Sequence, residues 1–108
     1  MILAVDFDGT LCADSYPEIG KANAELIEEL KRRQSRGDKL ILWTCRAEHF
    51  LDDAVVWCKN HGLYFDAVND NVPETVELWG HDSRKISADI YIDDRSEKPW
   101  NLILEKAV

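Results

Sequence analysis

The sequence predicts an α/β protein with a three-layer, Rossmann-like parallel sheet and helices on both faces. Short apolar segments alternate with segments of helical periodicity, and the first apolar segment lacks the alternation expected of a half-exposed strand. Strands that alternate with helices are joined by right-handed crossovers, and these produce a parallel sheet. With 108 residues, the chain has room for one domain, residues 1–108, built around one hydrophobic core.

The elements can be assigned in order along the chain. Four apolar segments are predicted to be strands, at residues 2–7, 39–44, 64–68 and 88–92. Two segments rich in helix-forming residues are predicted to be helices, at residues 21–36 and 48–61, and a glycine follows each of them. The remaining stretches are a long loop at residues 69–84, with one helical turn near 74–79, and a fifth strand or closing helix at residues 100–104.

Composition and charge limit the partners of the protein. An apolar content of 45% is typical of a folded globular chain, and no segment approaches the roughly 20 apolar residues that span a bilayer. The net charge of -8 argues against extended binding to nucleic acid and against binding to anionic membranes. We therefore expect a cytoplasmic protein. Its three cysteines, Cys12, Cys45 and Cys58, have irregular spacing and are predicted to be reduced thiols that pack as small hydrophobic residues.

Polar residues stand at the ends of three predicted strands. Asp6 and Asp8 end the first strand, Thr44 ends the second, and Asp93 and Asp94 follow the fourth. In a parallel sheet, ligands bind beyond the carboxyl ends of the strands, because these ends meet at one edge. The five side chains are therefore expected to converge on one crevice.

The acidic residues of this crevice predict a metal ion. Asp6 and Asp8 are two positions apart, so an extended backbone places both on one side and turns Phe7 into the core. Four carboxylates in one crevice repel each other, and a hard divalent cation with oxygen ligands relieves that repulsion. Because Mg²⁺ suits a site of few carboxylates, water and phosphate, we expect Mg²⁺ as the cofactor.

The other polar residues predict a phosphoryl group as ligand. Thr44 can donate a hydrogen bond to a phosphate oxygen, and the ammonium group of Lys85 can neutralise phosphate charge. Arg46, Arg84 and Arg95 are near these residues in the sequence. With its charge neutralised by metal and lysine, a phosphate can be attacked by an aspartate without electrostatic rejection.

The set Asp6-Phe-Asp8-Gly-Thr10, Thr44, Lys85 and Asp93-Asp94 resembles, in order and spacing, the four motifs of the haloacid dehalogenase (HAD) superfamily of phosphatases. The resemblance extends from residue 2 to about residue 95. It implies a HAD-like fold and a phosphoric monoester hydrolase that forms an aspartyl-phosphate.

The resemblance also implies a role for each matching residue. Asp6 would be the nucleophile and a metal ligand, and Asp8 would be the general acid and base, with its backbone carbonyl as a second metal ligand. Asp94 would bind the metal directly, and Asp93 would support the metal site or bond to Lys85. Thr44 and Lys85 would hold the phosphate.

The same superfamily usually covers its site with an inserted cap domain, which this chain has no room for. The two places where caps are inserted, residues 11–20 and 69–84, are too short for one. The chain thus resembles a small capless member, whose site is open or is closed by a neighbouring subunit of a homo-oligomer. We expect a phosphorylated small molecule as substrate, such as a nucleotide or sugar phosphate, with Arg46 and Arg95 as further phosphate ligands.

Three alternative functions can be compared with this prediction. A non-catalytic module that binds Mg²⁺ or phosphate would keep the fold, but it would need only one of Asp6 and Asp8. A phosphorelay receiver domain would carry its phosphorylated aspartate on the third strand, which does not match this order of residues. Dehalogenation needs no metal, so the second acidic pair argues against it.

Overall fold

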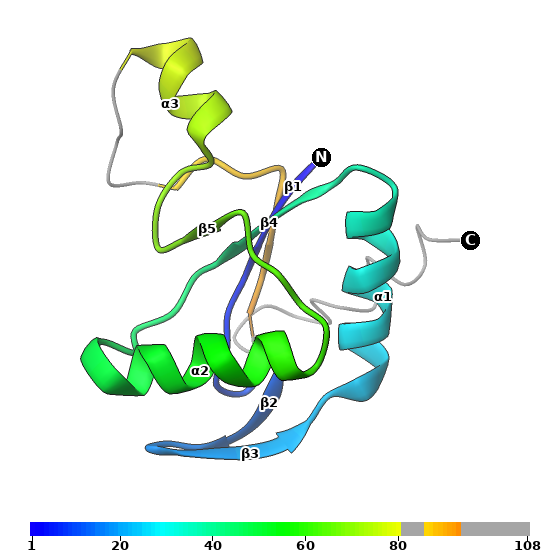
Figure 1. Ribbon diagram of the computed structural model, residues 1–108, viewed down its shortest axis with the longest axis vertical. Helices are drawn as coiled ribbons and strands as arrows, with labels where there is room; N and C mark the ends of the chain where they lie inside the picture. Colours follow the sequence, from blue (N-terminus) through cyan, green and yellow to red (C-terminus); the bar gives the residue numbers. More distant parts are fainter. Residues whose placement is uncertain (81–85, 94–108) are drawn as a thin grey trace.

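The computed structural model describes residues 1–80 and 86–93, which form one α/β unit without an additional domain. Its central sheet has four strands in the order β5-β4-β1-β6, and all neighbouring strands are parallel (Figure 1). The strands are β1 (Ile2–Val5), β4 (Lys39–Leu42), β5 (Ala67–Val68) and β6 (Ile90–Ile92). The predicted fold class is thereby confirmed.

Both faces of the sheet are buried, which explains the uninterrupted apolar run of β1. Leu3 and Val5 face one layer and belong to the main core cluster. Helices α1 (Ala24–Ser35) and α2 (Glu48–Asn60) contribute their buried side chains to this cluster. Ala4 points to the other face, where it packs with Ile41, Val72 and Ile86. A strand that is buried on both sides has no polar face, so it shows no alternation.

Strand order decides which face each helix covers. From β1 to β4 and on to β5 the chain moves in one direction across the sheet, so right-handed crossovers place α1 and α2 on the same face. The connection from β5 to β6 runs back in the opposite direction and crosses the other face. This connection contains α3 (Pro73–Trp79), which agrees with the predicted helical turn.

A small hairpin follows β1 and was not predicted. Strands β2 (Cys12–Ser15) and β3 (Glu18–Ala22) pair antiparallel, with an irregularity near Cys12. Of the residues in its two strands only Cys12 is buried, so the hairpin lacks the apolar periodicity that indicates a strand. The two strands approach closely at Gly20, where a Cβ atom would lie 2.3 Å from the carbonyl oxygen of Ala13.

The hairpin also corrects the predicted start of the first helix. The helix was expected from residue 21, but residues 21 and 22 belong to β3 and the helix begins at Ala24. Asn23 caps it by accepting a hydrogen bond from the backbone N–H of Leu26 at 3.3 Å. All four predicted strands are shorter than expected, since β1, β4, β5 and β6 hold only residues 2–5, 39–42, 67–68 and 90–92. The element predicted at residues 100–104 lies outside the described residues.

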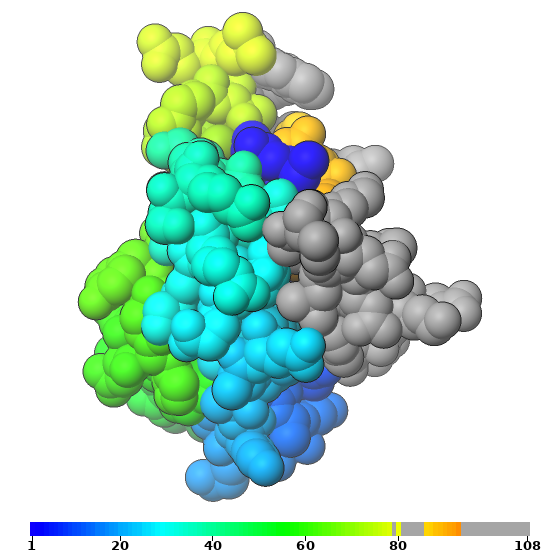
Figure 2. All heavy atoms as spheres, turned by 90° about the vertical axis from the view of Figure 1, so that its right-hand side faces the viewer, coloured from blue at the N-terminus to red at the C-terminus, as the bar shows by residue number. Residues whose placement is uncertain are grey.

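The hairpin and α3 lie at opposite ends of the molecule's longest axis (Figures 1 and 2). The hairpin continues directly from the carboxyl end of β1, so it is the described insertion that adjoins the predicted site. Among the described helices, none is long and apolar enough to cross a membrane.

Candidate functional site

The loop after β1 holds the first two predicted site residues. Asp6 leaves the sheet beside β6, because its backbone N–H donates to the carbonyl of Ile92 at 2.8 Å. One oxygen of its carboxylate accepts a hydrogen bond from the backbone N–H of Phe7 at 2.8 Å. The Phe7 ring is fully buried, as predicted, and packs edge-on against Trp57. Asp6 and Asp8, on either side of Phe7 in the sequence, are both half-buried.

A tight turn returns the chain from this loop to the hairpin. The carbonyl of Phe7 accepts hydrogen bonds from the backbone N–H groups of Thr10 and Leu11 at 3.1 and 2.9 Å. Gly9 has a φ of 82°, a value that residues with a side chain rarely adopt. The glycine of the Asp-Gly-Thr sequence is therefore required by the backbone.

Asp8 forms a bidentate ion pair with Arg46 that the sequence did not reveal. The Nε and Nη2 atoms of Arg46 donate to the two carboxylate oxygens of Asp8, both at 2.8 Å. The Arg46 side chain is 1% exposed, whereas that of Asp8 is 20% exposed. The hydrogen bonds to Asp8 raise the pKa of Arg46 above its ordinary value. Two residues that are 38 positions apart thus form one unit.

Thr44 lies at the carboxyl end of β4, next to this pair. Its hydroxyl oxygen accepts a hydrogen bond from the backbone N–H of Arg46 at 3.1 Å. Its own backbone N–H donates to the side-chain oxygen of Asn69 at 2.8 Å. Asn69 follows β5 with a φ of 54°, a left-handed conformation that asparagine tolerates well. Asn69 therefore positions Thr44, a role that its place after a predicted strand could have suggested.

Arg46 was predicted to bind phosphate, but in the structure its guanidinium binds protein groups instead. Its Nη1 donates to the carbonyls of Pro17 and Phe50, at 3.2 and 3.4 Å, and its Nη2 also donates to the carbonyl of Glu18 at 3.0 Å. Together with the two bonds to Asp8, these contacts engage all five N–H donors of the guanidinium. In this arrangement, Arg46 holds protein groups and has no donor left for a substrate.

The second acidic pair is described only in part. Asp93 is half-buried and directly follows Ile92, the register partner of Val5. Asp6 and Asp93 therefore leave adjacent strands at the same level. Asp94 and Arg95 lie outside the described residues, so their predicted roles stay predictions.

The segment before β6 approaches the sheet from its other end. Asp89 donates its backbone N–H to the carbonyl of Ile2 at 2.8 Å and accepts from the backbone N–H of the same residue at 2.6 Å. Residue 89 therefore lies at the amino end of β1, away from Asp6. Lys85 and Arg84 lie outside the described residues, and the predicted contact of Lys85 with phosphate stays a prediction.

The described part of the chain offers oxygen donors for a hard cation but no complete cluster of ligands. No three His, Cys, Asp or Glu side chains within residues 1–80 and 86–93 gather closely enough to hold a metal ion. Both carboxylate oxygens of Asp8 are bound by Arg46, which leaves the backbone carbonyl of this residue as the donor that the resemblance implies. The carboxylates of Asp6 and Asp93 are oxygen ligands of the type that Mg²⁺ prefers.

The cysteines near the site differ in environment. Cys12 and Cys58 are buried, as predicted, and burial raises the pKa of both thiols. Cys45 was predicted to be a small buried residue but is exposed, because it follows β4 in the loop that carries Thr44 and Arg46. No zinc-type cluster forms around them in the part of the chain that is described.

Comparison with known proteins places the chain in a class and in a family. No protein-family profile and no curated protein matches it. The fold and the residues at its strand ends define a protein of the Rossmann-like, parallel α/β class. A solved structure of a conserved protein from Bacteroides thetaiotaomicron is 43% identical, with a TM-score of 0.84, over 99% of this chain and 88% of that one. The chain belongs to the same family as this conserved Bacteroides protein.

Proposed function

We propose that the protein is a Mg²⁺-dependent, HAD-type phosphatase that hydrolyses a phosphate monoester through an aspartyl-phosphate on Asp6. The observation that carries the proposal is the arrangement at the carboxyl ends of three adjacent strands. Asp6 and Asp8 follow β1, Thr44 follows β4 and Asp93 follows β6. In a parallel sheet this is the edge at which ligands bind.

In the first step, a carboxylate oxygen of Asp6 attacks phosphorus and the bond between phosphorus and the ester oxygen breaks. Asp8 donates a proton to the departing alkoxide, so that an alcohol leaves. Phe7 separates the two acids and is locked into the core, which gives each of them a distinct position in the loop. The products are the alcohol and an acyl phosphate on Asp6.

In the second step, water hydrolyses the acyl phosphate. The ionised Asp8 now removes a proton from the attacking water, which restores the carboxylic acid for the next cycle. The bond between phosphorus and Asp6 breaks, so inorganic phosphate leaves and the carboxylate of Asp6 is regenerated. One residue thus serves as acid and base in turn.

Mg²⁺ would be held by the carboxylates of Asp6, Asp93 and Asp94 and by the backbone carbonyl of Asp8. When bound, it supplies positive charge that offsets the phosphate dianion beside the acidic residues. The hydroxyl oxygen of Thr44 already accepts a hydrogen bond from the backbone N–H of Arg46. Thr44 would therefore donate its hydroxyl proton to a phosphate oxygen. Lys85 and Arg95 would complete the phosphate contacts.

The substrate we propose is a phosphorylated small molecule such as a nucleotide or sugar phosphate. The hairpin β2–β3 spans residues 12–22, so it can form one wall of the site but cannot enclose a substrate as a cap domain does. A net charge of -8 opposes a long nucleic-acid strand at this site. A second copy of the chain could supply the missing wall, which makes a homo-oligomer part of the proposal.

A non-catalytic module that binds Mg²⁺ or phosphate is the second candidate. The observation in its favour is the Asp8–Arg46 pair, because a carboxylate with both oxygens bound by a guanidinium is not immediately available as an acid. The two candidates differ in one measurable property, since only the phosphatase releases inorganic phosphate.

The test is a screen of phosphate esters with and without Mg²⁺, covering sugar phosphates, nucleotides and phosphorylated polynucleotide ends. We expect Mg²⁺-dependent release of phosphate from at least one class. Asp6→Asn should lower kcat by at least about 1,000-fold, because the amide is a poor nucleophile. The control is Asp53→Asn, an exposed position on α2, which should keep the wild-type rate. Phosphate release from no class would exclude the phosphatase and favour the binding module.

A further inference from the structure

Arg46 joins three segments of the chain around Asp8. Its guanidinium binds the carboxylate in the β1 loop, the carbonyls of Pro17 and Glu18 where the hairpin turn enters β3, and the carbonyl of Phe50 in the first turn of α2. A side chain with every donor engaged and 1% exposure has a single orientation. The position of Asp8 is thereby tied to the hairpin and to α2.

Two aromatic rings further restrict the guanidinium. Its central carbon lies 5.0 Å from the centroid of the Phe7 ring and 5.1 Å from that of the Tyr16 ring. Contacts of a cation with ring faces at this distance are attractive. Phe7 belongs to the buried core and Tyr16 to the hairpin turn, so Arg46 is fixed from the core side and from the side of the hairpin.

The backbone of Arg46 is held by the neighbouring site residue. Its N–H donates to the hydroxyl oxygen of Thr44, the proposed phosphate contact. One residue therefore links the group that would bind phosphate to the group that would donate the proton. The rigid side chain of Arg46 therefore fixes the distance between the Thr44 hydroxyl and the Asp8 carboxylate.

Resting on the proposed function, we infer that Arg46 is a positioning residue, which sets the place and the plane of the Asp8 carboxylate for proton transfer to the leaving group. A planar guanidinium binds both oxygens of a carboxylate and so fixes its rotation, whereas the ammonium group of a lysine is a point charge that leaves rotation free. A protonated Asp8 can accept through only one oxygen while it donates through the other. One contact with Arg46 is then given up and the second keeps the acid oriented.

This role makes the effect of Arg46 depend on the leaving group. An alkyl phosphate ester needs a proton on its departing oxygen, whereas p-nitrophenyl phosphate leaves as a stable anion and needs little help from a general acid. The experiment compares kcat/KM for both esters in the wild type, Arg46→Lys and Arg46→Gln, with Mg²⁺ present. This ratio covers the steps up to release of the leaving group and leaves out hydrolysis of the acyl phosphate, in which Asp8 also takes part. Arg46→Lys should lose about 10- to 100-fold on the alkyl ester and less than about threefold on the aryl ester.

Two further variants separate positioning from structural support. Arg33→Lys is the matched control, because Arg33 is another well-buried arginine that pairs with a carboxylate, that of Asp38 at 3.3 Å, away from the site. It should leave the ratio of the two kcat/KM values unchanged. In the Asp8→Asn background, Arg46→Lys should cause no further selective loss on the alkyl ester, since the residue through which Arg46 acts is already disabled.

The outcomes are distinguishable. Equal losses on both esters, no loss on the alkyl ester, or failure of both Arg46 variants to fold by circular dichroism would overturn the positioning role. A wild-type protein that hydrolyses neither ester nor any class of the phosphate screen would overturn the phosphatase proposal, and the inference with it. Selective loss on the alkyl ester that disappears in the Asp8→Asn background supports the inference.

Discussion

Single side chains in the core set how the protein responds to alkaline pH. Burial raises the pKa of the Cys58 thiol from 9.0 to about 12, and burial also raises that of Cys12. Both thiols lie in the main core cluster among aliphatic side chains, where a thiolate would lose its hydration. In the unfolded chain the same thiols ionise near their ordinary pKa. Their protonation therefore differs between the two states only above about pH 9.

We predict that the free energy of unfolding falls as the pH rises from about 9 toward 12. Below pH 9, Cys58 is neutral in both states and has no effect on the pH dependence. Above it, the unfolded chain releases a proton that the folded chain retains, which costs about 1.4 kcal/mol of stability at pH 10. Urea unfolding at pH 8 and at pH 10 measures this loss. Cys58→Ala should show a loss smaller by about that amount, and parallel losses in the two proteins would contradict the prediction.

The control for this measurement is Cys45→Ala. Cys45 is exposed, so its substitution removes a thiol but leaves the two buried thiols of the core unchanged. The pH dependence of Cys45→Ala should match that of the wild type.

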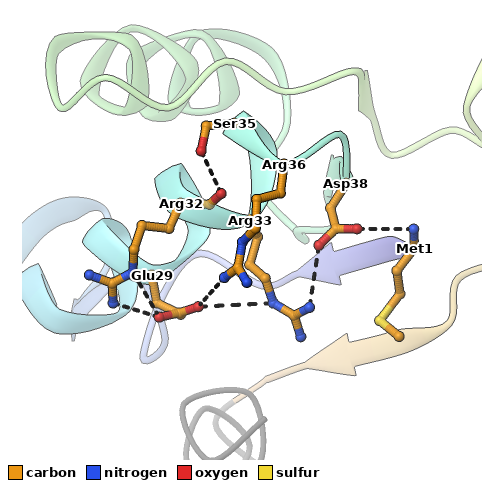
Figure 3. A network of polar contacts seen from close by, with 7 residues as sticks. All are labelled: Met1, Glu29, Arg32, Arg33, Ser35, Arg36 and Asp38. Atoms are coloured by element: carbon orange, nitrogen blue, oxygen red, sulfur yellow. Dashed lines mark hydrogen bonds and ion pairs between the residues drawn. The ribbon is translucent and has the colours of Figure 1, made fainter. Parts of the chain in front are cut away.

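Among the secondary-structure elements, α1 has an unusual buried charge. Glu29 is 1% exposed although it lies on a surface helix, and three arginines surround it (Figure 3). Arg32 donates to one carboxylate oxygen at 2.5 and 3.2 Å, and Arg36 and Arg33 lie 3.6 and 4.0 Å from the other. Arg33 also reaches Asp38, which connects the helix to the turn before β4. Glu29 thus organises the carboxyl-terminal half of α1.

We predict that Glu29→Gln lowers the free energy of unfolding by about 1–3 kcal/mol, because a buried group loses charge-assisted hydrogen bonds. Urea unfolding gives the value. Glu28→Gln is the matched control on the same helix, where the carboxylate is 62% exposed and pairs with Lys31 at 3.2 Å. An exposed ion pair contributes little, so this variant should stay within about 0.5 kcal/mol of the wild type. Equal effects of the two substitutions would show that the buried network contributes no more to the free energy of unfolding than an exposed ion pair does.

For the whole molecule, the proposed function makes stability depend on ligands. A ligand that binds only the folded state stabilises it by an amount that grows with the ratio of its concentration to Kd. The residues of the proposed site come from three strands, so binding there would cross-link β1, β4 and β6 at one edge of the sheet.

We predict that Mg²⁺ together with orthovanadate, a phosphate mimic, at concentrations about 100 times Kd raises the midpoint of thermal unfolding by about 10 °C. At 100 times Kd the stabilisation is about 2.7 kcal/mol, and a domain of this size shifts by about 4 °C or more per kcal/mol. Differential scanning fluorimetry measures the shift. It should vanish on addition of EDTA and in Asp6→Asn, whereas Asp53→Asn should keep it. A shift that persists in Asp6→Asn would place the ligand elsewhere.

Much of the fold was predictable because the relevant patterns are local. The apolar run of β1 and the spacing of apolar residues in α2 each reflect burial along one element, and a glycine follows each of the two long helices. The succession of strands and helices then restricts the sheet to a parallel arrangement with right-handed crossovers. For the same reason the sequence indicated which residues stand at the carboxyl ends of β1, β4 and β6.

What the sequence could not disclose are partnerships between distant positions. Arg46 appeared to be a phosphate ligand beside Thr44, and only the packing of the hairpin against α2 brings it onto Asp8 and engages its remaining donors. The burial of Glu29 and the exposure of Cys45 are equally invisible locally. Periodicity reports how one element meets its surroundings, so it predicts strands, helices and the edge where ligands bind. The partner of a charged side chain depends on which elements cross nearby, and that is decided when the whole chain packs.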